Sequence, residues 1–277
     1  MTNDSQKLCL DPNGGLPRLL EIMARLRDPE TGCPWDIEQT YKSIAPYTIE
    51  EAYEVADAID QSDFPELEGE LGDLLLQVVY YTQMGAEDGH FTFETVVKNI
   101  ADKMIHRHPH VFGDESRDKS STQQIVDWEK IKAAERASKS DTPSKTLDGV
   151  ALNLPALTRA VKLQKRAARI GFDWPDISGV IDKITEEVGE LVEAREIKTH
   201  ADQVEEYGDL MFVMANLARH LKIDPEEALR SANKKFQRRF DAVEQKLADT
   251  GKSPSQSTLT EMDTLWDAVK LEEKSKQ

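Results

Sequence analysis

The sequence is poor in cysteine and in aromatic residues. It has two cysteines, Cys9 and Cys33, and aromatic residues make up 6% of its 277 positions. Two cysteines form no disulfide framework, and their spacing matches no metal-binding motif. No apolar run approaches the roughly 20 residues that cross a membrane, and the first residues lack the basic and apolar segments of a signal peptide. We therefore expect a cytoplasmic protein with no membrane partner.

Basic residues are too few to balance the acidic ones. The chain has 35 Lys and Arg against 52 Asp and Glu, a formal net charge of −17. Such a field repels nucleic acid and anionic membranes as general partners. It still allows a small phosphorylated substrate, provided that a metal ion and nearby Lys or Arg side chains outweigh the field locally.

Alternating strand patterns are also missing, and helical spacing of apolar residues runs through almost the whole chain. The pattern predicts a first helix over residues 16–26 and another that opens at Pro46. Residues 138–150 have the composition of a linker. We expect an all-α protein of two similar helical units, at 1–137 and 151–277.

One acidic constellation occurs twice. Glu51, Glu54, Glu70 and Asp73 form two i,i+3 pairs, and the second set repeats the first with a constant offset of 136 residues: Glu187, Glu190, Glu206 and Asp209. Residues three apart share a face of a helix. Each unit therefore presents two helices with two carboxylates on one side, which indicates duplication of a whole unit.

Four oxygen ligands without His or Cys suit a hard cation, Mg²⁺ or, as a substitute, Mn²⁺. The competing interpretation is a solvated acidic face, which is common on helices. Gly72 and Gly208, next to the aspartates, argue against it, because glycine weakens a helix and suggests close approach by a neighbouring helix or a ligand.

The two copies differ in their cations. In the second copy, Lys183 precedes Glu187 by one turn, and Lys235 and Arg239 follow on a basic helix. The first copy has Tyr47, Met104 and His108 at these positions. Polyphosphate binding needs cations, so we expect the second unit to be the working site. The first quartet would then be a second, degenerate metal site. From the residues alone, Trp266 either stacks on a base or fills the core.

The chain resembles the MazG family of nucleoside triphosphate pyrophosphohydrolases, within the all-α NTP pyrophosphatase superfamily. The resemblance lies in the tandem acidic pairs and in the stretches GCPWD, PYTIEEAYEV, GELGDLLLQVV, RHPHVF, GFDW and NKKFQRRF. It implies Mg²⁺-dependent hydrolysis of an NTP or dNTP to a monophosphate and pyrophosphate, and a homodimer. By position, the second quartet would bind metal, Lys183, Lys235 and Arg239 would hold phosphates, and Trp266 would contact the nucleotide.

For the mechanism we expect Glu186 or one of the ligands, Glu187 for example, to accept a proton from the attacking water. The main alternative is a non-catalytic nucleotide or metal sensor that forms a regulatory dimer. A helical scaffold with acidic faces and a related enzyme acting on dUTP or on a phosphoribosyl nucleotide also stay open. A di-iron bundle is disfavoured, because its Glu-x-x-His pairs are missing from both quartets.

Overall fold

The computed structural model describes residues 3–138 and 145–275, and these residues form helices and no strand. The predicted all-α class is confirmed. The chain divides into two compact units, Met1–Glu135 and Arg136–Gln277. Residues 139–144 of the predicted linker lie outside the described part, so its bounds stay a prediction. None of the described helices combines the length and apolar character needed to cross a membrane.

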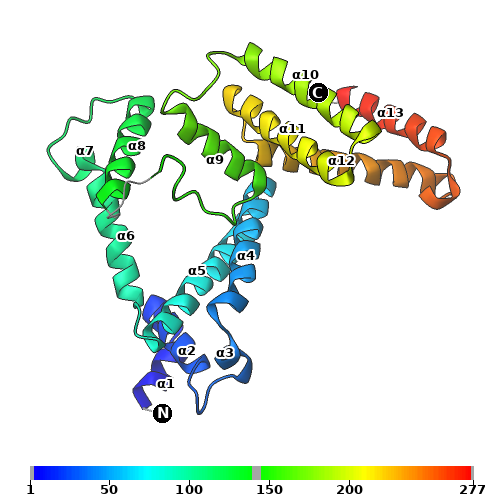
Figure 1. Cartoon of the computed structure of the whole chain (residues 1–277). Coiled ribbons are helices and arrows are strands. Elements are labelled where there is room, and N and C mark those ends of the chain that lie inside the picture. The colour runs from blue at the N-terminus through cyan, green and yellow to red at the C-terminus, as the bar shows by residue number, and fades with distance from the viewer. Residues whose placement is uncertain (1–2, 139–144, 276–277) are drawn as a thin grey trace. The chain divides into compact units, whose positions relative to one another are not determined.

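The first unit is built around one long antiparallel helix pair. Helices α4 and α5 pack along each other, and α1 and α2 cover one end of the pair (Figure 1). The elements are α1 (Asn3–Leu10), α2 (Gly15–Leu26), α3 (Pro34–Glu38), α4 (Tyr41–Gln61), α5 (Phe64–Glu87), α6 (Phe93–Arg107), α7 (Pro109–Phe112) and α8 (Ser121–Ser138).

Local capping decides where the paired helices begin. The expectation that a helix opens at Pro46 is wrong, because α4 starts at Tyr41 and contains Pro46. Thr40 and Ser43 form a capping box that satisfies free N–H groups of the first turn, and it outweighs the hydrogen bond lost at the proline. Asp63 caps α5 by accepting from the N–H of Glu66.

The core of the first unit lies at the end of the α4–α5 pair that α2 covers. Its buried members are Met23, Ile44, Val79, Tyr80 and Met84. Tyr80 is 4% exposed and donates its hydroxyl to the backbone carbonyl of Asp36, at 2.8 Å. This hydrogen bond connects α3 to α5, the helix that carries Glu70 and Asp73.

The second unit repeats the helix pair. Its elements are α9 (Ala156–Ala168), α10 (Ile177–Ile197), α11 (His200–His220), α12 (Pro225–Asp249), the 3₁₀ turn η1 (Pro254–Gln256) and α13 (Leu259–Ser275). Helices α10 and α11 pack along each other, and α9 packs on α11. A capping box of Thr199 and Asp202 starts α11. The acidic pairs of both units therefore lie on corresponding helix hairpins.

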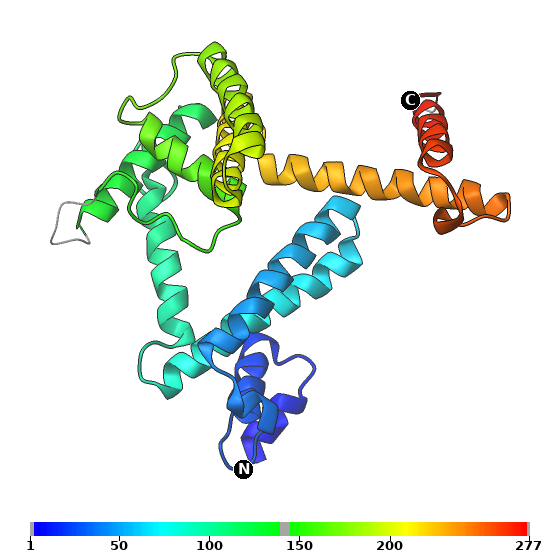
Figure 2. The ribbon, with the colours of Figure 1, turned by 45° about the vertical axis from the view of Figure 1, so that its right-hand side comes forward.

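Helix α12 continues beyond the α9–α11 group, as Figure 2 shows, and α13 packs against it. Val243 and Leu247 of α12 and Val269 of α13 are buried between the two helices, and Trp266 packs against this cluster. This small core keeps the basic stretch of α12 beside the tryptophan helix.

Each helix hairpin buries apolar side chains on one side and exposes others. The exposed ones include Leu71, Leu75 and Val78 of α5, and Val188 and Val192 of α10. At Gly72 and Gly208, an added Cβ would meet no atom within 4 Å. Among the described residues, therefore, no neighbouring helix makes the close approach at these glycines that the sequence suggested.

Candidate active site

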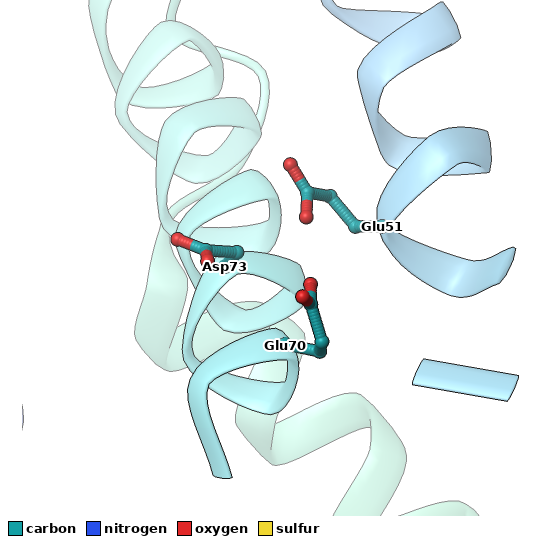
Figure 3. Close-up of side chains that lie close together, drawn as sticks. All are labelled: Glu51, Glu70 and Asp73. Atoms are coloured by element: carbon teal, nitrogen blue, oxygen red, sulfur yellow. The ribbon is translucent and has the colours of Figure 1, made fainter. Parts of the chain in front are cut away.

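The α4–α5 hairpin brings together three of its four predicted carboxylates. Glu51 projects from α4 towards Glu70 and Asp73 of α5 (Figure 3), and one oxygen of each lies within 4.8 Å of the others. Glu54 falls outside this group. It lines an adjoining acidic pocket of about 320 Å³ together with Glu70.

The described residues place no Lys or Arg side chain against this first cluster. Among the described residues, none of its three carboxylates forms an ion pair with Lys or Arg. Burial, and then the charges of Asp73 and Glu54, raise the pKa of Glu51. Burial and the charge of Glu54 likewise raise the pKa of Glu70. The cluster holds uncompensated negative charge, which a divalent cation would relieve.

The α10–α11 hairpin forms the corresponding cluster from Glu187, Glu190 and Glu206, again within 4.8 Å of one another. Asp209, the fourth predicted member, is exposed and lies outside the group. Glu187 is 4% exposed, and its Oε2 is buried without a hydrogen-bond partner. A buried carboxylate oxygen without a partner is costly, so this atom is a strong candidate for a cation ligand.

Two lysines compensate the second cluster. Lys183 Nζ lies 2.8 Å from carboxylate oxygens of both Glu186 and Glu187, and these hydrogen bonds raise the pKa of Lys183. Lys198, which ends α10, lies 3.1 Å from Glu206 Oε1, and this contact raises the pKa of Lys198.

The first unit has no counterpart of either lysine. The residues 136 positions before Lys183 and Lys198 are Tyr47 and Ser62. The contrast in cations that the sequence indicated at Lys183 therefore extends to a second position, Lys198.

The donor set fits a hard divalent cation. Three carboxylates converge, neither His nor Cys belongs to the group, and Glu187 Oε2 has no other partner. Oxygen-only sets of this kind suit Mg²⁺ and related ions. Burial, followed by the charge of Glu187, raises the pKa of Glu190. A bound cation would offset both the burial of the negative charge and the repulsion between the two carboxylates.

A second group of predicted site residues lies on α12 and α13. The Arg239 guanidinium sits over the Trp266 ring, 5.8 Å from its centroid, and Glu273 accepts from Arg239 Nε at 2.8 Å. Glu273 also pairs with Arg238 at 2.8 Å, and the two arginines lower the pKa of Glu273. Lys235 is exposed on the same helix.

The first unit has a related arrangement without the second arginine. Arg107 pairs with Glu135, and His108 takes the place of Arg239, with its ring edge-to-face on Trp128 at 5.1 Å. Trp128 donates its indole N–H to the carbonyl of Arg107. Both copies thus have a carboxylate, Glu135 or Glu273, that pairs with an arginine of the preceding basic helix.

The predicted site residues therefore fall into two groups. Glu186, Glu187, Glu190, Glu206 and Lys183 come together on α10 and α11, and Arg239 and Trp266 come together on α12 and α13. Sequence reasoning missed Lys198 and Glu273. Glu273 could have been found, because it stands 138 residues after Glu135, the offset that relates Trp128 to Trp266.

Comparison with known proteins identifies the family. The MazG nucleotide pyrophosphohydrolase domain matches twice, at residues 39–112 and 177–243. The chain is 51% identical to the nucleoside triphosphate pyrophosphohydrolase of Escherichia coli (strain K12), over 93% of this chain and 98% of that protein.

Two further relatives match most of this chain. The nucleoside triphosphate pyrophosphohydrolase/pyrophosphatase MazG of Thermotoga maritima is 42% identical over 91% of this chain and 94% of that protein. The uncharacterized protein YabN of Bacillus subtilis is 43% identical over 91% of this chain and 51% of its own length. Both matched regions contain the helix hairpin with its acidic cluster, and the chain belongs to the MazG nucleotide pyrophosphohydrolase family.

Proposed function

We propose that the α10–α11 cluster of the second unit is the seat of this enzyme's nucleoside triphosphate pyrophosphohydrolase activity. The reaction cleaves the bond between the α and β phosphates and releases a nucleoside monophosphate and pyrophosphate. The observation that carries the proposal is Glu187, a buried carboxylate with an unpartnered oxygen inside a three-carboxylate cluster. Lys183 and Lys198 beside the cluster supply cations that the first unit lacks.

The metal ion in this proposal is Mg²⁺, which Glu187, Glu190 and Glu206 would hold, with Asp209 as the fourth predicted ligand. When bound, the ion supplies Lewis acidity and lowers the pKa of a coordinated water. Glu186 is well placed to accept the proton of the attacking water, because it is exposed beside Glu187 and shares Lys183 with it.

Phosphate binding is assigned to the cations. Lys183, which contacts Glu187, would hold a phosphate oxygen of the bound nucleotide. Arg239 and Lys235 hold the leaving pyrophosphate, and Trp266 contacts the nucleotide. Fixed positive charges that stabilise the transition state supply most of the acceleration in phosphoryl transfer.

A homodimer would join the two groups of site residues. Within the described part of the second unit, Arg239 and Trp266 find their partners on α12 and α13, and the acid cluster finds its own on α10 and α11. The hairpins also expose apolar side chains such as Val188 and Val192. Association of two copies would bury these faces and bring α12 of one chain towards the cluster of the other.

For the first unit we propose a degenerate metal site without turnover. Glu51, Glu70 and Asp73 converge as their counterparts do, but without a compensating cation. This favours a metal- or nucleotide-sensing role for this unit over catalysis.

Product analysis tests the assignment. The purified enzyme is incubated with each standard NTP and dNTP and MgCl₂, and monophosphate plus pyrophosphate is separated from diphosphate plus phosphate. We expect the first product pair, and its loss in Glu187→Ala with retained helical circular dichroism. Normal hydrolysis by a folded Glu187→Ala enzyme would overturn the assignment of the cluster.

A further inference from the structure

The first unit contains an acidic tract that the reaction of the second unit does not use. One end of the tract is the cluster of Glu51, Glu70 and Asp73 (Figure 3). The other end is the pocket of about 320 Å³, which shares Glu70 with the cluster and is also lined by Glu54 and Glu66. Among the described residues that line this pocket, none is basic. The tract therefore carries concentrated negative charge along the α4–α5 hairpin.

The second unit places two ammonium groups of its own chain against the corresponding carboxylates. Lys183 Nζ lies 2.8 Å from Glu187 Oε1. Lys198 Nζ lies 3.1 Å from Glu206 Oε1. The two glutamates belong to one cluster, so each lysine neutralises part of it. This hairpin thus shows where ammonium groups bind when the fold supplies them.

The first unit keeps the two acceptors and lacks both ammonium groups. Glu51 and Glu70 stand 136 positions before the two glutamates, whereas Tyr47 and Ser62 take the lysine positions. Burial and neighbouring carboxylates raise the pKa of both Glu51 and Glu70, as expected for negative charges that repel one another. A ligand with two ammonium groups would replace the missing lysines.

A buried amide beside Glu51 supplies an independent sign of a ligand. Gln77, one turn after Asp73, is 8% exposed, and its Nε2 lies 3.5 Å from Glu51 Oε1. Its Oε1 is buried without a hydrogen-bond partner. The second unit has the apolar side chain of Val213 at this position. A buried acceptor without a donor indicates a group that a ligand satisfies, and only the first unit provides it.

Aromatic side chains lie on the other side of Glu51. Tyr47 precedes Glu51 by one turn of α4 and is 42% exposed. Trp35 of α3 is 52% exposed and packs edge-to-face on Tyr47, with ring centroids 6.3 Å apart. Exposed rings beside carboxylates attract organic cations. They also pack against methylene chains, which a hydrated metal ion does not have. This pair therefore favours an organic cation.

We propose that the acidic tract of the first unit binds a linear aliphatic polyamine, with one ammonium group held by Glu51 and Gln77 and the next by Glu70. Ammonium groups separated by three or four methylene carbons lie about 5–6 Å apart, given single bonds of about 1.5 Å. This is close to one helical turn of about 5.4 Å, the approximate spacing of Glu51 and Glu54 on α4 and of Glu66 and Glu70 on α5. Each primary ammonium group has three N–H donors for these oxygens. The site goes beyond the metal site proposed for this unit and does not depend on where hydrolysis occurs.

Calorimetric titration of the full chain with spermidine tests the proposal. The titration is made with EDTA and about 0.15 M KCl, which screens non-specific attraction. We expect one spermidine per chain. Tyr47→Lys restores the ammonium group of the second unit beside Glu51 and should weaken binding about tenfold or more, because like charges repel at close range. Leu10→Lys adds the same charge at an exposed position of α1 and is the matched control, with unchanged affinity.

Gln77→Val copies the second unit and keeps the test decisive if Tyr47→Lys does not fold. It should weaken spermidine binding about tenfold through loss of a hydrogen bond to a charged group. Equal weakening by Leu10→Lys, or several equivalent spermidines per chain, would overturn the proposal, because the net charge alone would then explain the binding. Binding of Mg²⁺ without binding of spermidine would also overturn it. The proposed function is tested separately, by hydrolysis in Glu187→Ala.

Discussion

Metal binding at the α10–α11 cluster should appear as a stability change that a single oxygen-to-amide replacement removes. Glu187→Gln keeps the shape of the side chain, which is 4% exposed, but replaces a carboxylate ligand by a neutral amide. Glu51→Gln makes the same change in the first unit and is the matched comparison.

The magnitude follows from ligand linkage. A cation at about 100 times its Kd stabilises the native state by about 2.7 kcal/mol. At about 2–4 °C per kcal/mol for a unit of this size, the wild-type melting temperature should rise by about 5–11 °C. Loss of a direct ligand weakens the site by about 100-fold or more, which leaves about 0.4 kcal/mol and a shift of about 1 °C.

The assay is calorimetry with MgCl₂ or with EDTA, together with amide hydrogen exchange to assign the protected helices. We expect Mg²⁺ to protect α10 and α11 in the wild type and in Glu51→Gln, but not in Glu187→Gln. A full Mg²⁺ shift in Glu187→Gln, with loss of the shift in Glu51→Gln, would refute the reasoning and place the metal in the first unit.

Three further outcomes are expected. Glu273→Gln removes the ion pair that positions Arg239 and should lower kcat/KM about 5- to 30-fold. The corresponding change in the first unit, Glu135→Gln, should leave kcat/KM unchanged. Equal effects of the two changes in steady-state kinetics would refute the positioning role. Lys198→Met removes a cation that competes for Glu206, so metal binding without nucleotide should tighten in isothermal titration; weaker binding would contradict this. Because burial and Glu187 raise the pKa of Glu190, the charged form destabilises the metal-free fold as pH rises through that pKa. Glu190→Gln should therefore raise the metal-free melting temperature at about pH 7 and not at about pH 4; a gain independent of pH would show that charge is not its cause.

The acidic clusters could be predicted from the sequence because they depend on local geometry. An i,i+3 pair shares a helix face whatever the tertiary structure, and the constant offset of 136 residues made chance spacing improbable. The prediction could not tell which three carboxylates meet. The structure leaves out Glu54 in one unit and Asp209 in the other, and this depends on side-chain positions across the hairpin.

The start of α4 and the role of Lys198 could not be predicted, because neither follows from the repeat or from the spacing of apolar residues. Pro46 indicated a helix start, but the helix begins after the capping box at Thr40, six residues earlier. Lys198 lies where α10 ends and has no counterpart in the first copy, so the repeat did not point to it.

The central claim is that the second unit carries out the reaction. Its most direct test is the yield of monophosphate and pyrophosphate from an NTP with MgCl₂, measured side by side for the wild type, Glu54→Ala and Glu190→Ala. We predict wild-type yield from Glu54→Ala and none from Glu190→Ala. Loss of product in Glu54→Ala alone would contradict the account and move the active site to the first unit.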